Sequence, residues 1–120
     1  MTAEESLGVA VRGHLSGAGA MSEVKMFGGT GFLLNGNLVA AVSKRGLLLR
    51  VGKDRHRHAL TWPGARSMEM RGRTMEGYVY IDPPVPTDGA LKAWLAEAIA
   101  FVKTLPIKSK KPRGPRGPST

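Results

Sequence analysis

The chain has 120 residues, 42% of them hydrophobic, and a formal net charge of +9 from 18 Lys and Arg against nine acidic residues. It contains no cysteine, which excludes disulfides and cysteine-based zinc sites and fits a reducing compartment. The length predicts one compact domain, and the charge indicates either a polyanionic partner or a solubilising role.

The chain begins with a predicted amphipathic helix. Thr2 and Glu5 have the spacing of a capping box, with a hydroxyl at the cap and a carboxylate three residues later. Leu7, Val11 and Leu15 then recur on one helical face. An acidic start is unlike a secretory signal, and no apolar run is long enough to cross a bilayer. We therefore expect a cytoplasmic protein without a membrane partner.

A compact motif of two apolar residues and three glycines follows, formed by Met26, Phe27, Gly28, Gly29 and Gly31. A dinucleotide-binding loop needs a third glycine five positions after Gly29 and then a helix. That position is Leu34, and the sequence after the motif predicts a strand. We therefore expect no phosphate or other cofactor here. Gly28 and Gly29 are interpreted as redirecting the chain, with Met26 and Phe27 anchored in the core.

Three strands are predicted next, over residues 31–35, 38–43 and 47–51. The Asn35-Gly36 pair between the first two is a strong signal for a hairpin turn. Lys44-Arg45-Gly46 marks a second turn. Segments that are joined by turns this short pair as antiparallel strands.

The second half predicts a short polar helix over 53–61, strands over 67–71 and 77–81, and an amphipathic helix from residue 88 to 105. Tyr78 and Tyr80 are expected on one face of the last strand. The order is helix, three strands, short helix, two strands, helix. It predicts a two-layer α+β domain over residues 1–105, with an antiparallel sheet covered by the N- and C-terminal helices.

Residues 106–120 form a tail rich in Pro, Gly, Lys and Arg that cannot build a core, and we expect it to be disordered. The tail has no acidic residue and carries five basic ones, Lys108, Lys110, Lys111, Arg113 and Arg116.

A second set of basic residues lies between positions 44 and 73, opposed only by Asp54 and Glu69: Lys44, Arg45, Arg50, Lys53, Arg55, Arg57, Arg66, Arg71 and Arg73. If the turns and the short helix meet at one end of the sheet, this set forms a positive patch that binds nucleic acid non-specifically. The alternative is a set of ordinary solvated arginines. No helix-turn-helix, aromatic RNA-binding motif or zinc finger indicates sequence-specific readout.

Few residues of the sequence indicate catalysis, metal binding or ligand binding. The serines lie in no nucleophile motif, and Glu69 and Glu76 are interpreted as balancing nearby arginines. His56 and His58 do not face each other on a helix, so a metal site is not expected. Trp62 either stacks on a ligand or, as is more usual, covers the core. We expect no enzymatic activity.

The segment from Lys25 to Gly31 resembles the N-terminal domain of the TfoX (Sxy) family of competence regulators. Gly36, Leu38-Val39-Ala40, the run 47–51, Tyr78-Val79-Tyr80, the prolines at 83 and 86, and the helix start at Leu91 and Trp94 are also similar. The resemblance covers about residues 3 to 105. Full-length members of the family carry a second, C-terminal domain, whereas a basic tail stands there in this chain.

The resemblance implies the fold order α-β(3)-α-β(2)-α and a role near the transcriptional control of DNA-uptake genes, without known enzymatic activity. Two hypotheses follow. The first is a regulatory module that binds another protein, such as part of the transcription machinery, through an exposed sheet face or edge. The second is a protein that binds nucleic acid non-specifically through the tail and the basic residues of 44–73.

Overall fold

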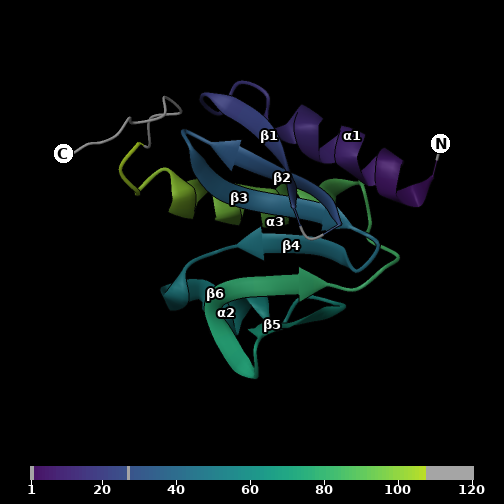
Figure 1. Ribbon diagram of the computed structural model, residues 1–120, viewed down its shortest axis with the longest axis vertical. Helices are drawn as coiled ribbons and strands as arrows, with labels where there is room; N and C mark the ends of the chain where they lie inside the picture. Colours follow the sequence, from purple (N-terminus) through teal and green to yellow (C-terminus); the bar gives the residue numbers. More distant parts are fainter. Residues whose placement is uncertain (1, 27, 108–120) are drawn as a thin grey trace.

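The computed structural model describes residues 2–26 and 28–107 (Figure 1). The helical elements are α1 (Ala3–Leu15), the 3₁₀ turn η1 (Lys53–Arg55), α2 (His56–Ala59) and α3 (Gly89–Val102). The strands are β1 (Met21–Met26), β2 (Gly29–Leu34), β3 (Asn37–Ser43), β4 (Gly46–Arg50), β5 (Ala65–Met70) and β6 (Arg73–Ile81).

The six strands form one sheet in the order β1-β2-β3-β4-β6-β5, and every neighbouring pair is antiparallel. Helices α1 and α3 lie against one face of this sheet, and α2 lies on the same side near β6 (Figure 1). The predicted α+β class, with an antiparallel sheet covered by the first and last helices, is therefore confirmed. The predicted short helix is present as η1 followed by α2.

The structure has one strand more than the sequence predicts, because β1 precedes the expected first strand. It pairs with β2 over six consecutive residues, from Met21 opposite Leu34 to Met26 opposite Gly29. As an edge strand β1 buries little surface, and none of its residues is fully buried. Its sequence therefore lacks the apolar run by which the inner strands are recognised.

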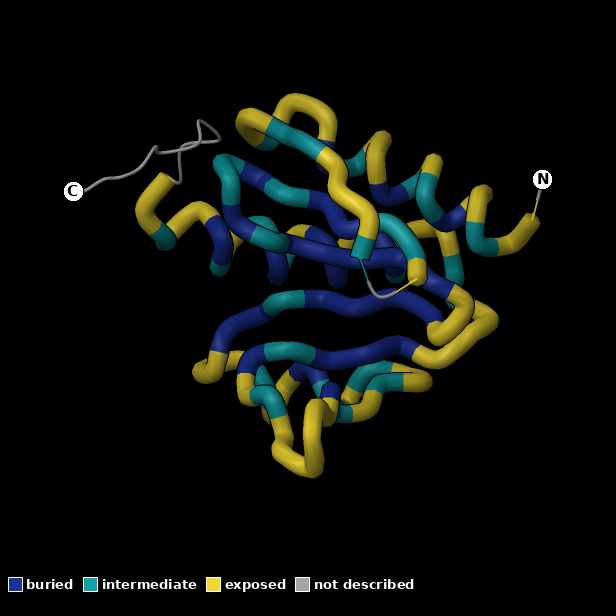
Figure 2. The backbone as a smooth tube through the Cα atoms, viewed as in Figure 1, coloured by how far each residue is buried: buried dark blue, intermediate teal, exposed yellow. Residues whose placement is uncertain are grey.

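The main core lies between the sheet and the helices. Helices α1 and α3 contribute Val11, Leu15 and Leu95, all fully buried, and the middle strands contribute Phe32 and Leu47 among others. Figure 2 shows that β3, β4 and the second half of β6 are mostly buried, while β1 and the turn between β5 and β6 are largely exposed. The strands in the middle of the sheet thus hold the domain together through the hydrophobic effect.

Two tryptophans close this core between α3 and the segment that follows α2. Trp94 is 6% exposed, and its ring stacks on Trp62 with centroids 5.7 Å apart and an interplanar angle of 22°. His58 meets Trp62 edge-on at 6.0 Å. Trp62 therefore covers the core, which is the more usual of the two roles expected for it.

The capping box predicted for the first helix is present in full. The Thr2 hydroxyl accepts a hydrogen bond from the Glu5 backbone N–H at 3.0 Å, and the Glu5 carboxylate accepts one from the Thr2 N–H at 2.8 Å. Two N–H groups that the helix itself leaves unpaired are thus satisfied.

We expect Thr2→Ala to lower the free energy of unfolding by about 1 kcal/mol, because it removes the oxygen that accepts from the first turn. Urea unfolding followed by circular dichroism measures this change. Thr2→Ser, which keeps the hydroxyl, is the control, and an equal loss in both variants would show that the cap contributes nothing.

Candidate functional site

The face of the sheet opposite the helices, here called the open face, is covered by no helix among the described residues. One row of cross-strand neighbours runs across it from edge to edge: Val24, Gly31, Ala41, Leu48, Tyr80 and Arg66. Side chains of a strand alternate between faces. The residues next to this row, such as Leu47, Leu49 and Val79, therefore belong to the main core.

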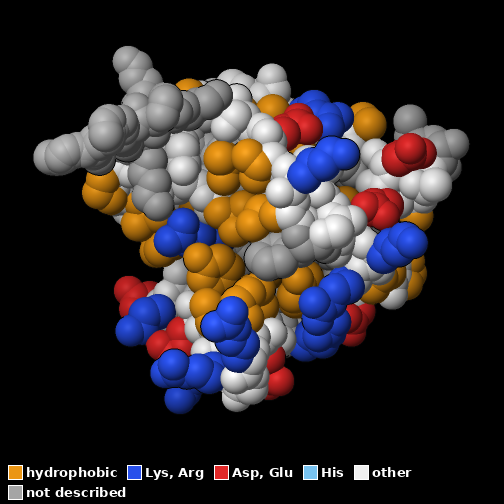
Figure 3. All heavy atoms as spheres, viewed as in Figure 1, with side chains coloured by type: hydrophobic (Ala, Val, Ile, Leu, Met, Phe, Trp, Pro, Cys, Tyr) orange, Lys and Arg blue, Asp and Glu red, His pale blue; other side chains and the backbone are white. Residues whose placement is uncertain are grey.

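The open face is apolar in its middle. Ala41, Leu48, Met68 and Tyr80 form a second buried cluster there, and three partly buried residues pack against it: Leu38, Met75 and Tyr78. Val24, in the edge strand, is 42% exposed. Figure 3, which views this face, shows hydrophobic side chains gathered over the middle of the sheet with Lys and Arg around them.

Three arginines lie over the two tyrosines of this face. The guanidinium carbon of Arg45 is 5.1 Å from the centre of the Tyr80 ring, and that of Arg66 is 5.4 Å from the same ring. Arg50 is directly opposite Tyr78 in the register, and its guanidinium carbon lies 5.6 Å from the centre of the Tyr78 ring. These distances are within the range of cation–π attraction, so the arginines are held against the apolar surface.

The expected placement of Tyr78 and Tyr80 on one face is confirmed. The sequence did not predict that arginines of three other segments cover them. Arg45 comes from the β3–β4 turn, Arg50 from β4 and Arg66 from β5. Only the pairing of the strands brings these residues together.

The glycine motif lies at the hairpin between β1 and β2. Met26 and Gly29 form the last pair of the hairpin, and Gly28, with φ of +75°, adopts a conformation that favours glycine. A Cβ at Gly29 would overlap the carbonyl oxygen of Val42. The residues after the motif form β2, so no helix N-terminus follows the glycines to hold a phosphate.

The expectation that Met26 is anchored in the core is wrong. Met26 is only partly buried, and its sulfur lies on the open face where a Cβ at Gly31 would stand. The missing side chain at Gly31 gives the flexible Met26 room to cross the neighbouring strand. Phe27, the other expected anchor, lies outside the described residues.

The basic residues of 44–73 do not meet at one end of the sheet, so the condition for a single positive patch is not fulfilled. Lys44 and Arg45 lie in the turn before β4, whereas Lys53, Arg55 and Arg57 follow the other end of that strand. Arg71 and Arg73, at the β5–β6 turn, lie at the same end as η1, because β6 runs antiparallel to β4. The length of β4 therefore separates the set into two groups.

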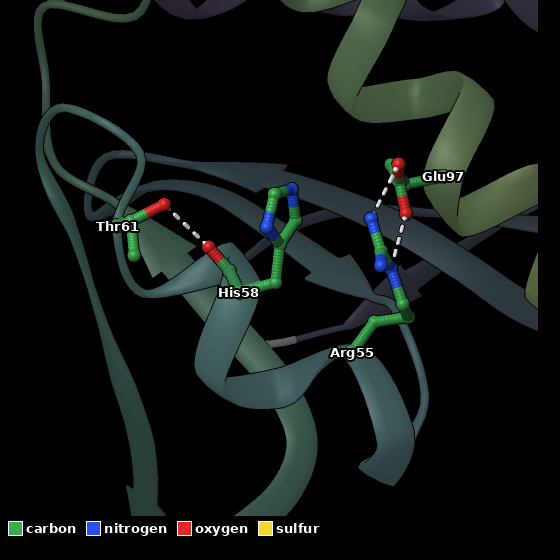
Figure 4. A network of polar contacts seen from close by, with 4 residues as sticks. All are labelled: Arg55, His58, Thr61 and Glu97. Carbon is green, nitrogen blue, oxygen red and sulfur yellow. Dashed lines mark hydrogen bonds and ion pairs between the residues drawn. The ribbon is translucent and has the colours of Figure 1, made fainter.

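Several of these cations also form ion pairs within the domain. Arg55 binds both carboxylate oxygens of Glu97 on α3, at 2.9 and 3.1 Å (Figure 4). The Nζ of Lys53 lies 3.6 Å from a carboxylate oxygen of Glu76, so the basic residue beside Glu76 is a lysine where arginines were expected. Arg66 donates to Asp82 at 2.6 Å. All these pairs are exposed to solvent and contribute little stability.

His56 forms polar contacts that hold neighbouring elements of the fold together. Its Nδ1 accepts a hydrogen bond from the Gly77 backbone N–H at 2.8 Å, and its Nε2 lies 3.3 Å from the Ser67 hydroxyl. His56 thereby joins α2 to β5 and β6. The carbonyl of His58 accepts a hydrogen bond from the Thr61 hydroxyl at 2.6 Å (Figure 4). Within the part of the chain that the structure describes, no three His, Asp or Glu side chains gather as a metal site would require.

The five basic residues of the tail, Lys108, Lys110, Lys111, Arg113 and Arg116, lie outside the described residues. The described part of the chain, residues 2–26 and 28–107, also has no helix with the length and apolarity needed to cross a bilayer.

Helix α1 is tied to β1 by one bidentate ion pair. Arg12 donates to Glu23 through Nε at 2.5 Å and through Nη2 at 2.9 Å. The hydrogen bonds and charge of Arg12 lower the pKa of Glu23 from its usual 4.5, against a smaller opposing effect of burial. A carboxylate whose pKa is lowered by folding stabilises the protein above its unfolded pKa, and this contribution is lost as the pH falls.

We expect Arg12→Ala to return the pKa of Glu23 toward its ordinary value. The free energy of unfolding should then fall less between neutral and acid pH than it does in the wild type. Nuclear magnetic resonance titration of the Glu23 carboxyl measures the first effect. Urea unfolding at a series of pH values below 5 measures the second. An unchanged Glu23 titration in the variant would contradict the assignment of its lowered pKa to Arg12.

These features define the class of protein: a two-layer α+β domain with a six-stranded antiparallel sheet, helices on one face and an apolar, arginine-bordered open face on the other. The family model of the TfoX N-terminal domain matches residues 13–102, and the chain belongs to this family. No curated protein and no solved structure matches the chain.

Proposed function

We propose that this domain is a non-enzymatic module that binds another protein through the open face. The observation that carries the proposal is the apolar cluster of that face, where Leu38, Met75 and Tyr78 remain partly exposed. An apolar surface bordered by polar residues is typical of a protein-binding site. Its strands are held by the main core beneath them, so the surface is already formed before binding.

The border of the open face indicates the chemistry of the partner. Arg45 and Arg50 lie on the tyrosine rings, so their side chains lose little freedom when a partner binds. Arg66 also lies on Tyr80, but its guanidinium is already paired with Asp82. Arginine that is held on an aromatic ring binds carboxylates well and is enriched at interfaces. The partner that fits best presents large apolar side chains next to Asp or Glu residues.

The family supports a regulatory role for this interaction. By analogy with the TfoX family, whose resemblance implies a role near the transcriptional control of DNA-uptake genes, we infer a regulatory role for this module. The partner that we propose is then a component of the transcription machinery in the cytoplasm. The acidic partner surface inferred from the arginines provides a criterion by which such a partner is recognised.

Three polar side chains of types that often act in catalysis already have partners within the domain. This supports a binding function over a catalytic one. His56 uses one ring nitrogen for Gly77 and places the other near Ser67. Glu97 is engaged by Arg55, and Glu76 lies beside Lys53. Catalysis by such groups would first require breaking these contacts.

The experiment compares three full-length chains recovered from cells of the source organism after cross-linking. Leu38→Glu places a charge in the middle of the open face, and Val9→Glu places the same charge on α1, where Val9 is 52% exposed. We expect wild type and Val9→Glu to recover the same acidic protein and Leu38→Glu to lose it. Equal recovery with all three chains, each shown to be folded by circular dichroism, would refute the proposal.

A second candidate function is non-specific binding of nucleic acid. The observation that favours it is the group of exposed basic residues near the β5–β6 turn, with Arg57, Arg71 and Arg73 at the same end of the sheet. Phosphate contacts give an affinity that falls steeply with salt.

Binding of duplex DNA, measured against salt for the full chain and for a chain ending at Leu105, separates the sources of such affinity. Affinity that survives truncation and is lost in Arg71→Ser/Arg73→Ser assigns the binding to the turn. Affinity that vanishes on truncation assigns it to the tail. If the full chain does not bind duplex DNA at low salt, the nucleic-acid hypothesis is refuted.

A further inference from the structure

The sheet ends on one side in a strand whose outer edge pairs with no other strand of the described chain. Strand β1 is last in the sheet order, and its register with β2 runs over six residues without a bulge. The other edge strand, β5, has an irregular register between Ser67 and Glu69. A bulge protects an edge against further pairing, whereas a regular edge is a template for another strand.

The hairpin register determines which residues of β1 present their backbone groups at this edge. Two residues separate Met26 from Gly29, so this pair closes the hairpin as a hydrogen-bonded pair. Hydrogen-bonded and non-hydrogen-bonded pairs then alternate along an antiparallel ladder. Ser22 and Val24 therefore direct their N–H and C=O groups toward β2, and Glu23 and Lys25 direct theirs outward.

The charges at the outward positions are of opposite sign and lie two residues apart. In an antiparallel pair of two β1 strands centred on Val24, Glu23 of each copy lies opposite Lys25 of the other. A shift of two residues in either direction places Glu23 opposite Glu23 or Lys25 opposite Lys25, and like charges directly opposite each other are destabilising. Of these three registers, only the one centred on Val24 thus satisfies both the backbone groups and the charges.

The geometry points to a second copy of this chain as the occupant of the β1 edge. The two sheets then join into one continuous sheet across a twofold axis that passes beside Val24. Val24 is 42% exposed in the single chain and meets its own counterpart in the pair. The open faces of both copies become one surface, because Val24 is the last member of the row that crosses the sheet to Tyr80 and Arg66. This inference does not depend on the proposed function.

Charge variants of the full chain test the register through the oligomeric state. Sedimentation equilibrium at physiological ionic strength is expected to show a concentration-dependent dimer for wild type. Glu23→Lys gives a chain with two lysines at the outward positions, and Lys25→Glu gives one with two glutamates. Each variant alone is expected to dimerise about tenfold more weakly, and an equimolar mixture to recover the wild-type affinity as a heterodimer. Lys25→Glu is the cleaner variant because it keeps the ion pair of Glu23 with Arg12.

A cross-link tests the twofold axis and does not rely on charge. The chain has no native cysteine, so Val24→Cys introduces a single thiol. Non-hydrogen-bonded partners lie about 4.5 Å apart between Cα atoms, within the range that a disulfide spans. We expect Val24→Cys to form a disulfide-linked dimer much faster than the control Val9→Cys. A wild-type chain that stays monomeric, a dimer that both charge variants leave unchanged, or equal rates for the two cysteines would each overturn the inference.

Discussion

Replacing Gly29 by alanine is expected to lower the free energy of unfolding by about 3 kcal/mol, at the upper end of the usual cost of overpacking. The added Cβ would overlap the carbonyl oxygen of Val42 and come within 2.9 Å of the Cα of Ser43. Both obstacles belong to the backbone of β3, which cannot rotate away as a side chain can. Relief therefore requires β2 and β3 to separate at the start of β2.

Gly13→Ala is the matched control, because it makes the same chemical change where no atom beyond the local helix backbone lies within 4 Å of the new Cβ. Gly13 lies inside α1, so this variant is expected to gain about 0.8 kcal/mol from helix propensity. Urea unfolding of the two variants therefore gives shifts of opposite sign. A neutral Gly29→Ala would mean that β2 and β3 are not in close contact at this point.

The second large effect is expected for Trp94→Ala, which should lower the free energy of unfolding by about 3 to 5 kcal/mol. Trp94 is 6% exposed and carries the stacked contact with Trp62 that fixes α3 against the segment after α2. Removing it leaves a cavity between two layers and frees the remaining indole.

Thermal and urea unfolding measure this loss, and near-ultraviolet circular dichroism reports whether the ring of Trp62 becomes mobile. Lys92→Ala, on the exposed side of the same helix, is expected to change stability by less than about 0.5 kcal/mol. A cost for Trp94→Ala as small as that of Lys92→Ala would contradict the packing of α3 described here.

Much of the fold was predictable because local signals agree with the final packing. The capping box at Thr2 and Glu5 begins α1 as expected. The Asn35-Gly36 pair forms the turn between β2 and β3, and both residues have positive φ. Such signals depend only on neighbouring residues, so the sequence carries them without knowledge of the tertiary structure.

Strand β1 and the position of Met26 were not predictable on the same basis. An edge strand needs no apolar alternation, because only one side of it pairs and little of it is buried. Met26 carries the same apolar signal as a core residue. Its place on the open face depends on the register that puts Gly31 two residues along the neighbouring strand.

The open face could be predicted only in part. The alternation in β6 indicates that Tyr78 and Tyr80 share one face, and this is confirmed. Their arginine neighbours come from the β3–β4 turn, β4 and β5, and nothing in the local sequence predicts which basic residues these are. The same dependence on topology divides the basic set of 44–73, which is continuous in the sequence and separated by the length of β4 in space.

Site-specific photo-cross-linking in the source cell tests most directly whether the open face is the binding surface. A photoreactive residue is placed at Leu38 on the open face or at Val9 on α1, in otherwise identical full-length chains. We predict a covalent adduct to one acidic protein from position 38 and none from position 9. An adduct to that protein from position 9 alone would place the partner on the helical side and contradict the proposal.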